Sequence, residues 1–212
     1  MIAVITRDPR FVDRRLQRDF DTTREQLIEI VKAAVAARGQ STDDSPRSAA
    51  AYYAWAAATT RLRQVFRQKG WDKGDENGIE TVVCHERKTQ IAVLSTDRWT
   101  ADERRPPRNR TIKGPASEKI IDLNEQFEFF SPEEMGQIAS SPYALWYLCI
   151  YDNGSKVRAE ISKPIEFLGG YITKYSERIF LLQEGDWEKV TIAPFGDDTA
   201  ASDDLEINVR RK

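Results

Sequence analysis

Six cationic side chains lie close together in residues 98–113, a stretch with only two acidic side chains and two adjacent prolines. Cationic groups at this density are typical of surfaces that contact phosphates or other acidic partners. The arginines, with Asn109 as a hydrogen-bond donor, could follow a phosphate backbone. The predicted contact residues in this stretch are Arg104, Arg105, Arg108, Asn109, Arg110 and Lys113.

Pro106 and Pro107 decide the local structure of this stretch. Proline lacks a backbone N–H and fixes its φ angle, so it is excluded from a helix interior and from a central strand. We therefore expect residues 98–113 to form an exposed, semi-rigid basic loop. Trp99, near its start, is a candidate for stacking on a base.

A second group of arginines is predicted on a helix that begins at Asp8-Pro9, an acid followed by proline at the first helical position. Apolar residues recur every four positions along this helix, so arginines collect on its other side. Three of them extend the predicted contact set: Arg10, Arg14 and Arg18. The alternative is that these are ordinary solvated charges on a surface helix.

One catalytic alternative is a Mg²⁺-dependent nuclease of the restriction-endonuclease type. Such enzymes hold the metal with two carboxylates and place a lysine near the attacking water. The candidates are Asp152, Glu160 and Lys163. Their spacing fits poorly, because side chains three positions apart on a strand face opposite ways.

Other catalytic and metal chemistries lack the residues they need. The one histidine, His85, directly follows Cys84. Neighbouring side chains on a strand point to opposite faces, so these two can neither bind one zinc ion together nor act as a nucleophile and its base. Cys149 and His85 could still pair across a sheet as a nucleophile and its base. The chain has no GxGxxG, GxxxxGK[ST] or GxSxG motif. We therefore expect no catalytic residues, no metal and no cofactor.

Charge is distributed unevenly along a chain of globular composition. The 212 residues are 40% hydrophobic and 31% charged, with a formal net charge of −2, so the field of the whole molecule does not favour an acidic partner. Residues 184–206 carry eight acids against Lys189. This acidic region is expected either to dock on the basic loop of the same molecule or to act as an autoinhibitory tail.

The expected location is the cytoplasm. No apolar run approaches the roughly 18 residues that a membrane span needs. The start, MIAVITRDPR, turns from apolar to charged too soon for a signal peptide. Two cysteines within apolar runs indicate buried thiols in a reducing compartment. A soluble protein without a membrane partner is predicted.

Helical signals dominate the first 70 residues. Three helices are expected, with starts at Asp8-Pro9, at a capping box of Thr22 and Glu25, and at Ser45-Pro46. The third helix carries bulky residues at helical spacing. These are predicted to be core residues: Tyr52, Trp55, Thr59, Leu62 and Phe66.

Strand signals begin near residue 79. Two hairpins are expected, and the turn Asp152-Asn153-Gly154 of the second is the strongest hairpin signal in the chain. A short helix is expected at residues 115–123. The predicted strands are 79–85 with 90–95, 143–151 with 156–161, and then 177–182 and 188–192.

These elements predict an α+β fold, with a helical N-terminal part packed on a mainly antiparallel β-sheet. Residues 1–70 form the helical part, 71–195 the β-rich part with the basic loop, and 196–212 an acidic tail. A division near residue 70 is possible. A single domain in which the long helix covers one face of the sheet fits equally well.

The sequence favours a non-catalytic binding or accessory module that engages an acidic partner through the basic loop, with nucleic acid preferred. An acidic protein surface would use the same arginines, and no helix-turn-helix, zinc-finger or RNP signature is recognisable. The alternatives are the Mg²⁺-dependent nuclease and a protein-binding inhibitor or assembly subunit. The oligomeric state stays open.

Overall fold

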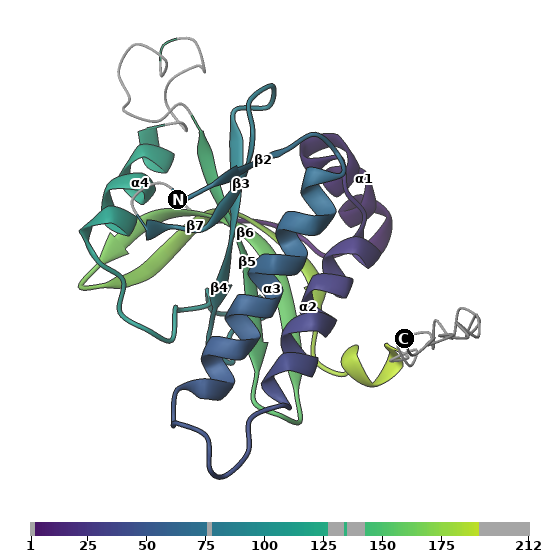
Figure 1. Cartoon of the computed structure of the whole chain (residues 1–212). Coiled ribbons are helices and arrows are strands. Elements are labelled where there is room, and N and C mark those ends of the chain that lie inside the picture. Colours follow the sequence, from purple (N-terminus) through teal and green to yellow (C-terminus); the bar gives the residue numbers. More distant parts are fainter. Residues whose placement is uncertain (1–2, 76–77, 127–133, 135–142, 191–212) are drawn as a thin grey trace, which may run out of the picture.

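Figure 1 shows the computed structural model, which describes residues 3–75, 78–126, 134 and 143–190. Within these residues the chain forms four α-helices and a seven-stranded sheet in the order β1-β7-β6-β5-β4-β3-β2. The helices are α1 Pro9–Phe20, α2 Arg24–Arg38, α3 Ala49–Arg67 and α4 Pro115–Gln126. The strands are β1 Val4–Thr6, β2 Asp72–Gly74, β3 Thr81–Cys84, β4 Thr89–Ser95, β5 Ala144–Asp152, β6 Val157–Leu168 and β7 Tyr171–Leu182.

The α+β class is confirmed, and the sheet is mixed. β4 runs parallel to β5, with Ile91 opposite Trp146, and β1 runs parallel to β7. The other neighbouring strands are antiparallel. A parallel pair requires a crossover connection, which here contains the basic loop and α4. The prediction of a mainly antiparallel sheet is only partly met, because the pattern of a single strand does not encode the direction of its partner.

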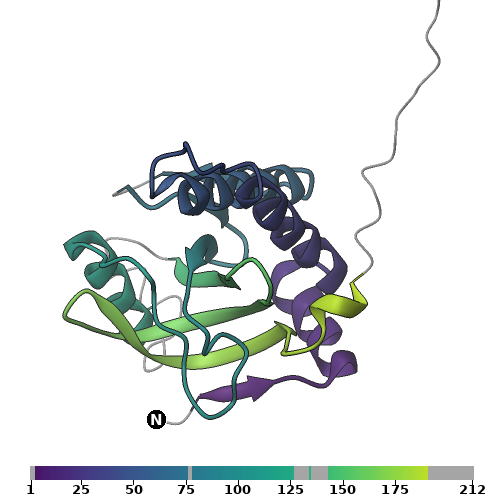
Figure 2. The same ribbon diagram turned by 90° about the horizontal axis from the view of Figure 1, so that it is seen from below.

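Helices cover both faces of this sheet, as Figure 2 shows. On β4, Ile91 and Val93 belong to the hydrophobic cluster under α1, α2 and α3, whereas Ala92 between them belongs to the cluster under α4. Successive side chains of a strand point to opposite faces, so the two clusters lie on opposite sides of the sheet. The larger cluster contains residues from both 1–70 and 71–195.

The first two helices begin where local capping chemistry places them. At the predicted Asp8-Pro9 step, the carboxylate of Asp8 accepts a hydrogen bond from the backbone N–H of Arg10 (3.0 Å). The capping box of α2 consists of Thr23 and Gln26, one residue later than predicted. Both helices are therefore confirmed, with a one-residue correction at the start of α2.

Helix α3 differs from its prediction at the N-terminal end. It begins at Ala49 rather than at the Ser45-Pro46 step, because a turn closed by Ala49 N–H and the Pro46 carbonyl precedes it (2.8 Å). The predicted core stripe is buried at Thr59, Leu62 and Phe66 and half-buried at Trp55. Tyr52 was wrongly assigned to the core. Tyr52 is 60% exposed, since the first turns of α3 line a pocket.

Both predicted hairpins are present, as β3–β4 and β5–β6, and the helix predicted at 115–123 is α4. The strand predicted at 188–192 is wrong where the chain is described. A turn after β7, in which Gln183 N–H donates to the Asp186 carboxylate (3.0 Å), leads into a 3₁₀ helix, Trp187–Lys189. The tail predicted at 196–212 lies outside the described residues.

Among the described residues, no helix is both long enough and apolar enough to cross a bilayer.

Candidate functional site

The basic loop, residues 98–113, connects β4 to α4 and contains no helix or regular strand, as its two prolines predict. An isolated bridge between Thr96 and Asn109 closes its base. The Asp97 N–H supports this closure by donating to the carbonyl of Arg108 (3.0 Å). The two ends of the loop are therefore held together at the end of β4.

Beneath the basic loop, Glu160 on β6 and Arg178 on β7 form an ion pair with only 0% and 2% of their surfaces exposed. The Nε and Nη2 atoms of Arg178 donate to the two carboxylate oxygens at 2.8 and 2.6 Å. The Ser162 hydroxyl donates a further hydrogen bond to Glu160 (2.7 Å). Charges away from water are tolerated only when they are paired and hydrogen-bonded, so each residue depends on the other.

The same ion pair holds the backbone of the basic loop. The Ala101 N–H donates to Glu160 Oε2 (2.5 Å), and Arg178 Nη1 donates to the carbonyls of Asp102 and Arg105 (2.9 and 3.2 Å). Ala101 has a φ of 52°, in the left-handed region that residues other than glycine seldom adopt. A buried, neutralised ion pair thus fixes the path of an exposed and mainly cationic segment.

Asn109 and Tyr175 fix the second half of the loop. The side-chain amide of Asn109 donates to the Gly170 carbonyl (2.9 Å) and accepts from the Ile172 N–H (2.8 Å), and the residue is only 2% exposed. The Tyr175 hydroxyl donates to the Pro107 carbonyl (3.1 Å). The structure therefore gives Asn109 a different role from the predicted one. Its amide is buried in hydrogen bonds that shape the loop and does not face outwards.

Two of the predicted contact residues are exposed and stack on aromatic rings. The guanidinium carbon of Arg105 lies 4.6 Å from the centroid of the Trp99 ring, and that of Arg108 lies 4.4 Å from the Tyr171 ring. Stacking occupies the face of a guanidinium and not the N–H donors at its edge. The guanidinium carbon of Arg98 also lies 5.0 Å from the Trp99 ring, so two arginines of the chain contact this ring, and its stacking on a base stays a prediction.

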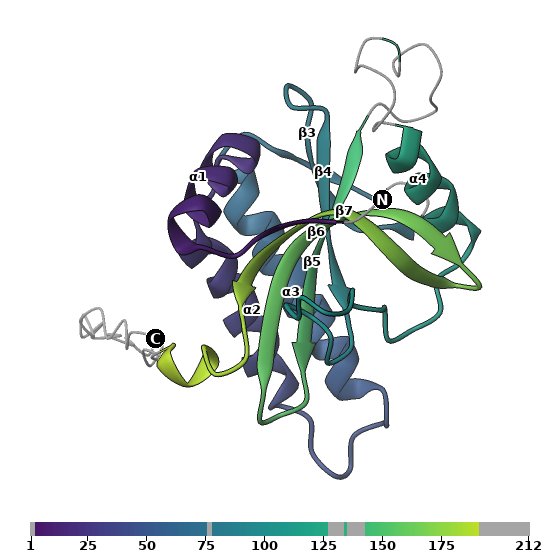
Figure 3. The same cartoon turned by 180° about the vertical axis from the view of Figure 1, so that it is seen from behind.

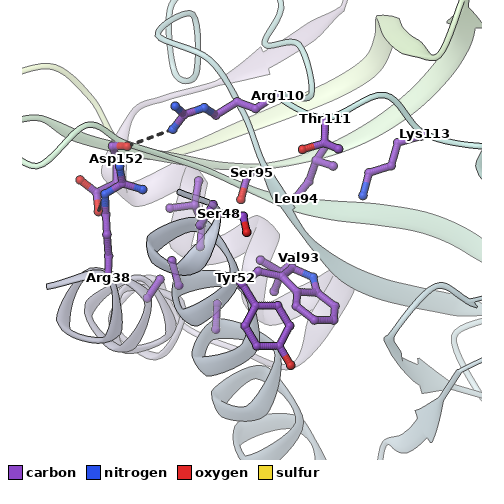
Figure 4. A pocket seen from close by; sticks show the side chains of 16 residues that line it. Arg38, Ser48, Tyr52, Val93, Leu94, Ser95, Arg110, Thr111, Lys113 and Asp152 are labelled. Carbon is purple, nitrogen blue, oxygen red and sulfur yellow. Dashed lines mark hydrogen bonds and ion pairs between the residues drawn. The ribbon is translucent and has the colours of Figure 1, made fainter. Parts of the chain in front are cut away.

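The remaining predicted loop residues lie in two other environments. Arg104 pairs with the Asp102 carboxylate, with Nη2 3.0 Å from Oδ2. Arg110 and Lys113 line a pocket between α3 and the ends of β4 and β5, which Figure 4 shows. The structure therefore divides the predicted set between the outer side of the loop and this pocket.

The predicted arginines of α1 are exposed, as the polar face of this helix requires. Each has a local partner: Asp8 for Arg10, Phe11 for Arg14 and Asp19 for Arg18. An ion pair between Arg7 and Glu103 joins the segment before α1 to the basic loop. Figure 3 shows this side of the molecule, with β1 leading into α1.

The three nuclease candidates, Asp152, Glu160 and Lys163, are buried, and the two carboxylates accept hydrogen bonds from other parts of the chain. Both oxygens of Glu160 are engaged in the contacts described above. Asp152 is 8% exposed, accepts from the Gly154 N–H (2.7 Å) and lies 3.6 Å from Arg38 Nε, and Lys163 is also buried. Over the described part of the chain, no three His, Cys, Asp or Glu side chains are grouped to hold a metal. This geometry favours structural roles for Glu160 and Asp152.

The thiol and imidazole groups do not combine into a reactive site. His85 is exposed, and its ring nitrogens contact the Asp72 carboxylate (2.9 Å) and the Tyr143 hydroxyl (2.7 Å). Cys149 is buried, and burial raises the pKa of its thiol well above the ordinary value. A thiolate nucleophile is therefore disfavoured at Cys149.

Arg178 and Tyr175, which hold the loop, and the pocket residue Arg38 were missed from the sequence, and Glu160 was considered only as a metal ligand. The sequence contains one signal of the polar contacts beneath the loop. Around Glu160, the odd positions 157, 159 and 161 are apolar while the even positions are polar, although β6 is a central strand. A central strand with one polar face needs a polar partner to cover it. The basic loop supplies that cover.

Comparison with protein-family models, with curated proteins and with solved structures gives no significant match. The assignment of function therefore depends on the geometry and chemistry of this chain.

Proposed function

We propose that this protein is a cytoplasmic, non-catalytic binding module whose basic loop contacts the phosphate backbone of a nucleic acid. The observation that carries the proposal is the stacking of Arg105 on Trp99 and of Arg108 on Tyr171. A stacked guanidinium still presents the planar fork of donors that binds a phosphate through two hydrogen bonds. Free cysteines at positions 84 and 149 support the cytoplasmic location.

Order in the loop before binding also supports the proposal. Immobilising a flexible side chain costs about 0.5–1.5 kcal/mol on association. The rings of Trp99 and Tyr171 already restrict the two guanidinium groups, and the Glu160–Arg178 ion pair fixes the backbone below them. Much of that cost therefore falls on folding rather than on binding.

The predicted residues are expected to contribute unequally. Arg104 is compensated by Asp102, so its net attraction for a phosphate is smaller than that of Arg105 or Arg108. The arginines of α1 have partners of their own and extend the surface rather than define it. The strongest loss on substitution is therefore expected from the two stacked arginines.

Fluorescence anisotropy with labelled single- and double-stranded DNA and RNA tests this proposal. The informative variant is Arg105→Ala with Arg108→Ala. Its matched control is Arg61→Ala with Arg67→Ala, which removes two exposed arginines from α3. Counterion release predicts that the logarithmic salt slope falls by about two for duplex DNA when two phosphate contacts are lost. The control is expected to keep the wild-type slope.

Absence of binding to all four nucleic acids at low salt would overturn the proposal and direct attention to an acidic protein partner. Equal losses in the loop variant and in the control would indicate general electrostatic attraction without a defined surface. The variant Arg10→Ala, Arg14→Ala and Arg18→Ala then measures how far the contact extends along α1.

A further inference from the structure

A pocket of about 490 Å³ lies between the first turns of α3, the end of α2 and the ends of β4 and β5. Its volume falls within the ~300–1,000 Å³ that is usual for small-molecule sites. The charged and aromatic side chains that line it are Arg38, Tyr52, Trp55, Arg110, Lys113 and Asp152 (Figure 4). Arg105 and Arg108 are not among its lining residues.

Positive charge exceeds negative charge in this pocket. The Asp152 carboxylate is already engaged with the Gly154 N–H and with Arg38. Within the described ranges, the side chain of Arg110 donates only to the backbone carbonyl of Asp152 (Nη1, 3.4 Å), and this contact does not neutralise its charge. Among the residues that the structure describes, none accepts a hydrogen bond from the Lys113 ammonium, and burial lowers the pKa of this group. An anionic ligand would stabilise both cations.

The wall opposite these cations is apolar and aromatic. Small side chains of α3 leave room in front of it, at Ala51 and Ala54. The rings of Tyr52 and Trp55 lie beside this space, 6.0 Å apart and tilted by 41°. Tyr52 is 60% exposed, so its side chain is accessible to a ligand in this space. The wall therefore offers a stacking surface for a flat ring.

We infer that this pocket binds a nucleoside monophosphate, with the phosphate against Arg110 and Lys113 and the base against Tyr52 and Trp55. Three hydroxyl groups of the lining can donate to phosphate oxygens, those of Ser48, Ser95 and Thr111. The aligned peptide dipoles of α3 add partial positive charge at its N-terminus, where the Ser48 side chain makes no capping hydrogen bond.

This site goes beyond the nucleic-acid proposal and does not depend on it. The stacked arginines lie outside the pocket, and the pocket cations lie at the far end of the basic loop. Each site can therefore be removed by substitution while the other is kept. A phosphate bound here would also contact β4 and α3, which the outer side of the loop does not reach.

Isothermal titration calorimetry of the full chain tests the inference. Adenosine and uridine monophosphates are the ligands, with adenosine and inorganic phosphate as partial ligands. We expect one bound monophosphate per chain and clearly weaker binding of either part alone. Lys113→Ala is expected to weaken binding about tenfold, the effect of one lost charged contact. Tyr52→Ala is expected to weaken it as well, and its exposed ring makes unfolding of this variant a small concern.

The variant Arg105→Ala with Arg108→Ala is the control and is expected to bind the monophosphates as the wild type does. Circular dichroism confirms that each variant is folded. The inference is overturned if neither monophosphate gives heat or a saturation-transfer NMR signal at about 1 mM, where even weak sites are occupied. Binding that ignores both Lys113→Ala and Tyr52→Ala also overturns it. If inorganic phosphate binds as tightly as the nucleotides, the base does not contribute to binding, and the inferred nucleoside monophosphate site is wrong.

Discussion

Arg178 Nη2 lies 2.6 Å from Glu160 Oε2, and both side chains are sealed from water by the backbone of the basic loop. The exposed positive charge of the basic loop thus lies over a buried, neutralised pair. This arrangement separates two tasks. The buried pair holds the backbone of the loop, and Arg105 and Arg108 on the outside remain exposed to solvent.

Loss of one member of this pair is expected to lower the free energy of unfolding. Glu160→Gln keeps the shape of the side chain and leaves Arg178 buried without a counter-charge. The free energy of unfolding should fall by about 3–5 kcal/mol, the usual range for breaking a buried pair. Urea unfolding measures it, with the exposed Glu118→Gln on α4 as the control. A loss below about 1 kcal/mol would show that the pair is not needed for stability.

Asn109→Ala is expected to loosen the basic loop. The substitution leaves the buried Ile172 N–H without its partner, at a cost of about 1–3 kcal/mol, and removes one of the two hydrogen bonds that the Gly170 carbonyl accepts. Limited trypsin digestion should then cut within residues 98–113 faster than in the wild type. Asn153→Ala alters a different turn and should leave cleavage of the loop unchanged. Unchanged cleavage in Asn109→Ala would contradict the anchoring role.

Adjacent glycines offer a matched test of the packing between the loop and β7. Gly170 has a φ of +87°, and a Cβ there would lie 2.6 Å from Ile112 Cγ2, whereas a Cβ at Gly169, with a φ of +59°, would meet nothing within 4 Å. Both alanine variants share the backbone strain of a positive φ. Gly170→Ala should therefore be less stable than Gly169→Ala by about 1 kcal/mol in thermal unfolding.

A double variant identifies the cause of that difference. Ile112→Ala removes the clashing methyl group, so Gly170→Ala in that background should cost no more than Gly169→Ala. If the difference between the two glycine variants persists without the Ile112 side chain, the contact between these residues is not its origin.

Alkaline pH is expected to destabilise the protein. Burial raises the pKa of Tyr147, Tyr175 and Cys149, so these groups stay protonated in the folded chain when they already ionise in the unfolded one. The unfolded state then binds fewer protons, and the free energy of unfolding falls as the pH rises above about 9. Burial lowers the pKa of Lys113, so this group makes the free energy of unfolding rise with pH. It is a single group, whereas the two tyrosines and the cysteine make the free energy of unfolding fall.

Ultraviolet absorbance of tyrosinate checks this expectation alongside urea unfolding at increasing pH. Two of the seven tyrosines should ionise only when the protein unfolds. Ionisation of all seven near the ordinary pKa of about 10 in folded protein would contradict the burial of this pair.

Local chemistry made much of the fold predictable. The Asp8-Pro9 step marks the start of α1, and the Asp152-Asn153-Gly154 turn marks the hairpin of β5 and β6. These signals depend on neighbours in sequence, so a single chain contains them. The parallel pairing of β4 with β5 depends on segments some 50 residues apart, with register such as Ile91 to Trp146, and no local pattern encodes it.

The candidate site was predictable in its charges and not in its geometry. The density of arginine pointed to the basic loop, but charge alone could not separate Arg105 and Arg108 from Arg110 and Lys113, which line a pocket. Asn109 was misassigned because an asparagine in a polar loop has the same local pattern whether it faces solvent or is buried. The difference arises from contacts with β7, far along the chain.

The anchors of the basic loop lie later in the chain than the loop itself. Glu160 is 59 positions beyond Ala101, and Arg178 is 76 positions beyond Asp102. During synthesis the arginines therefore emerge from the ribosome well before the strands that hold them. A polypeptide that stops short of β7 carries the charge of the basic loop without the ion pair that fixes its backbone. The basic loop consequently acquires its shape only after β7 has been synthesised.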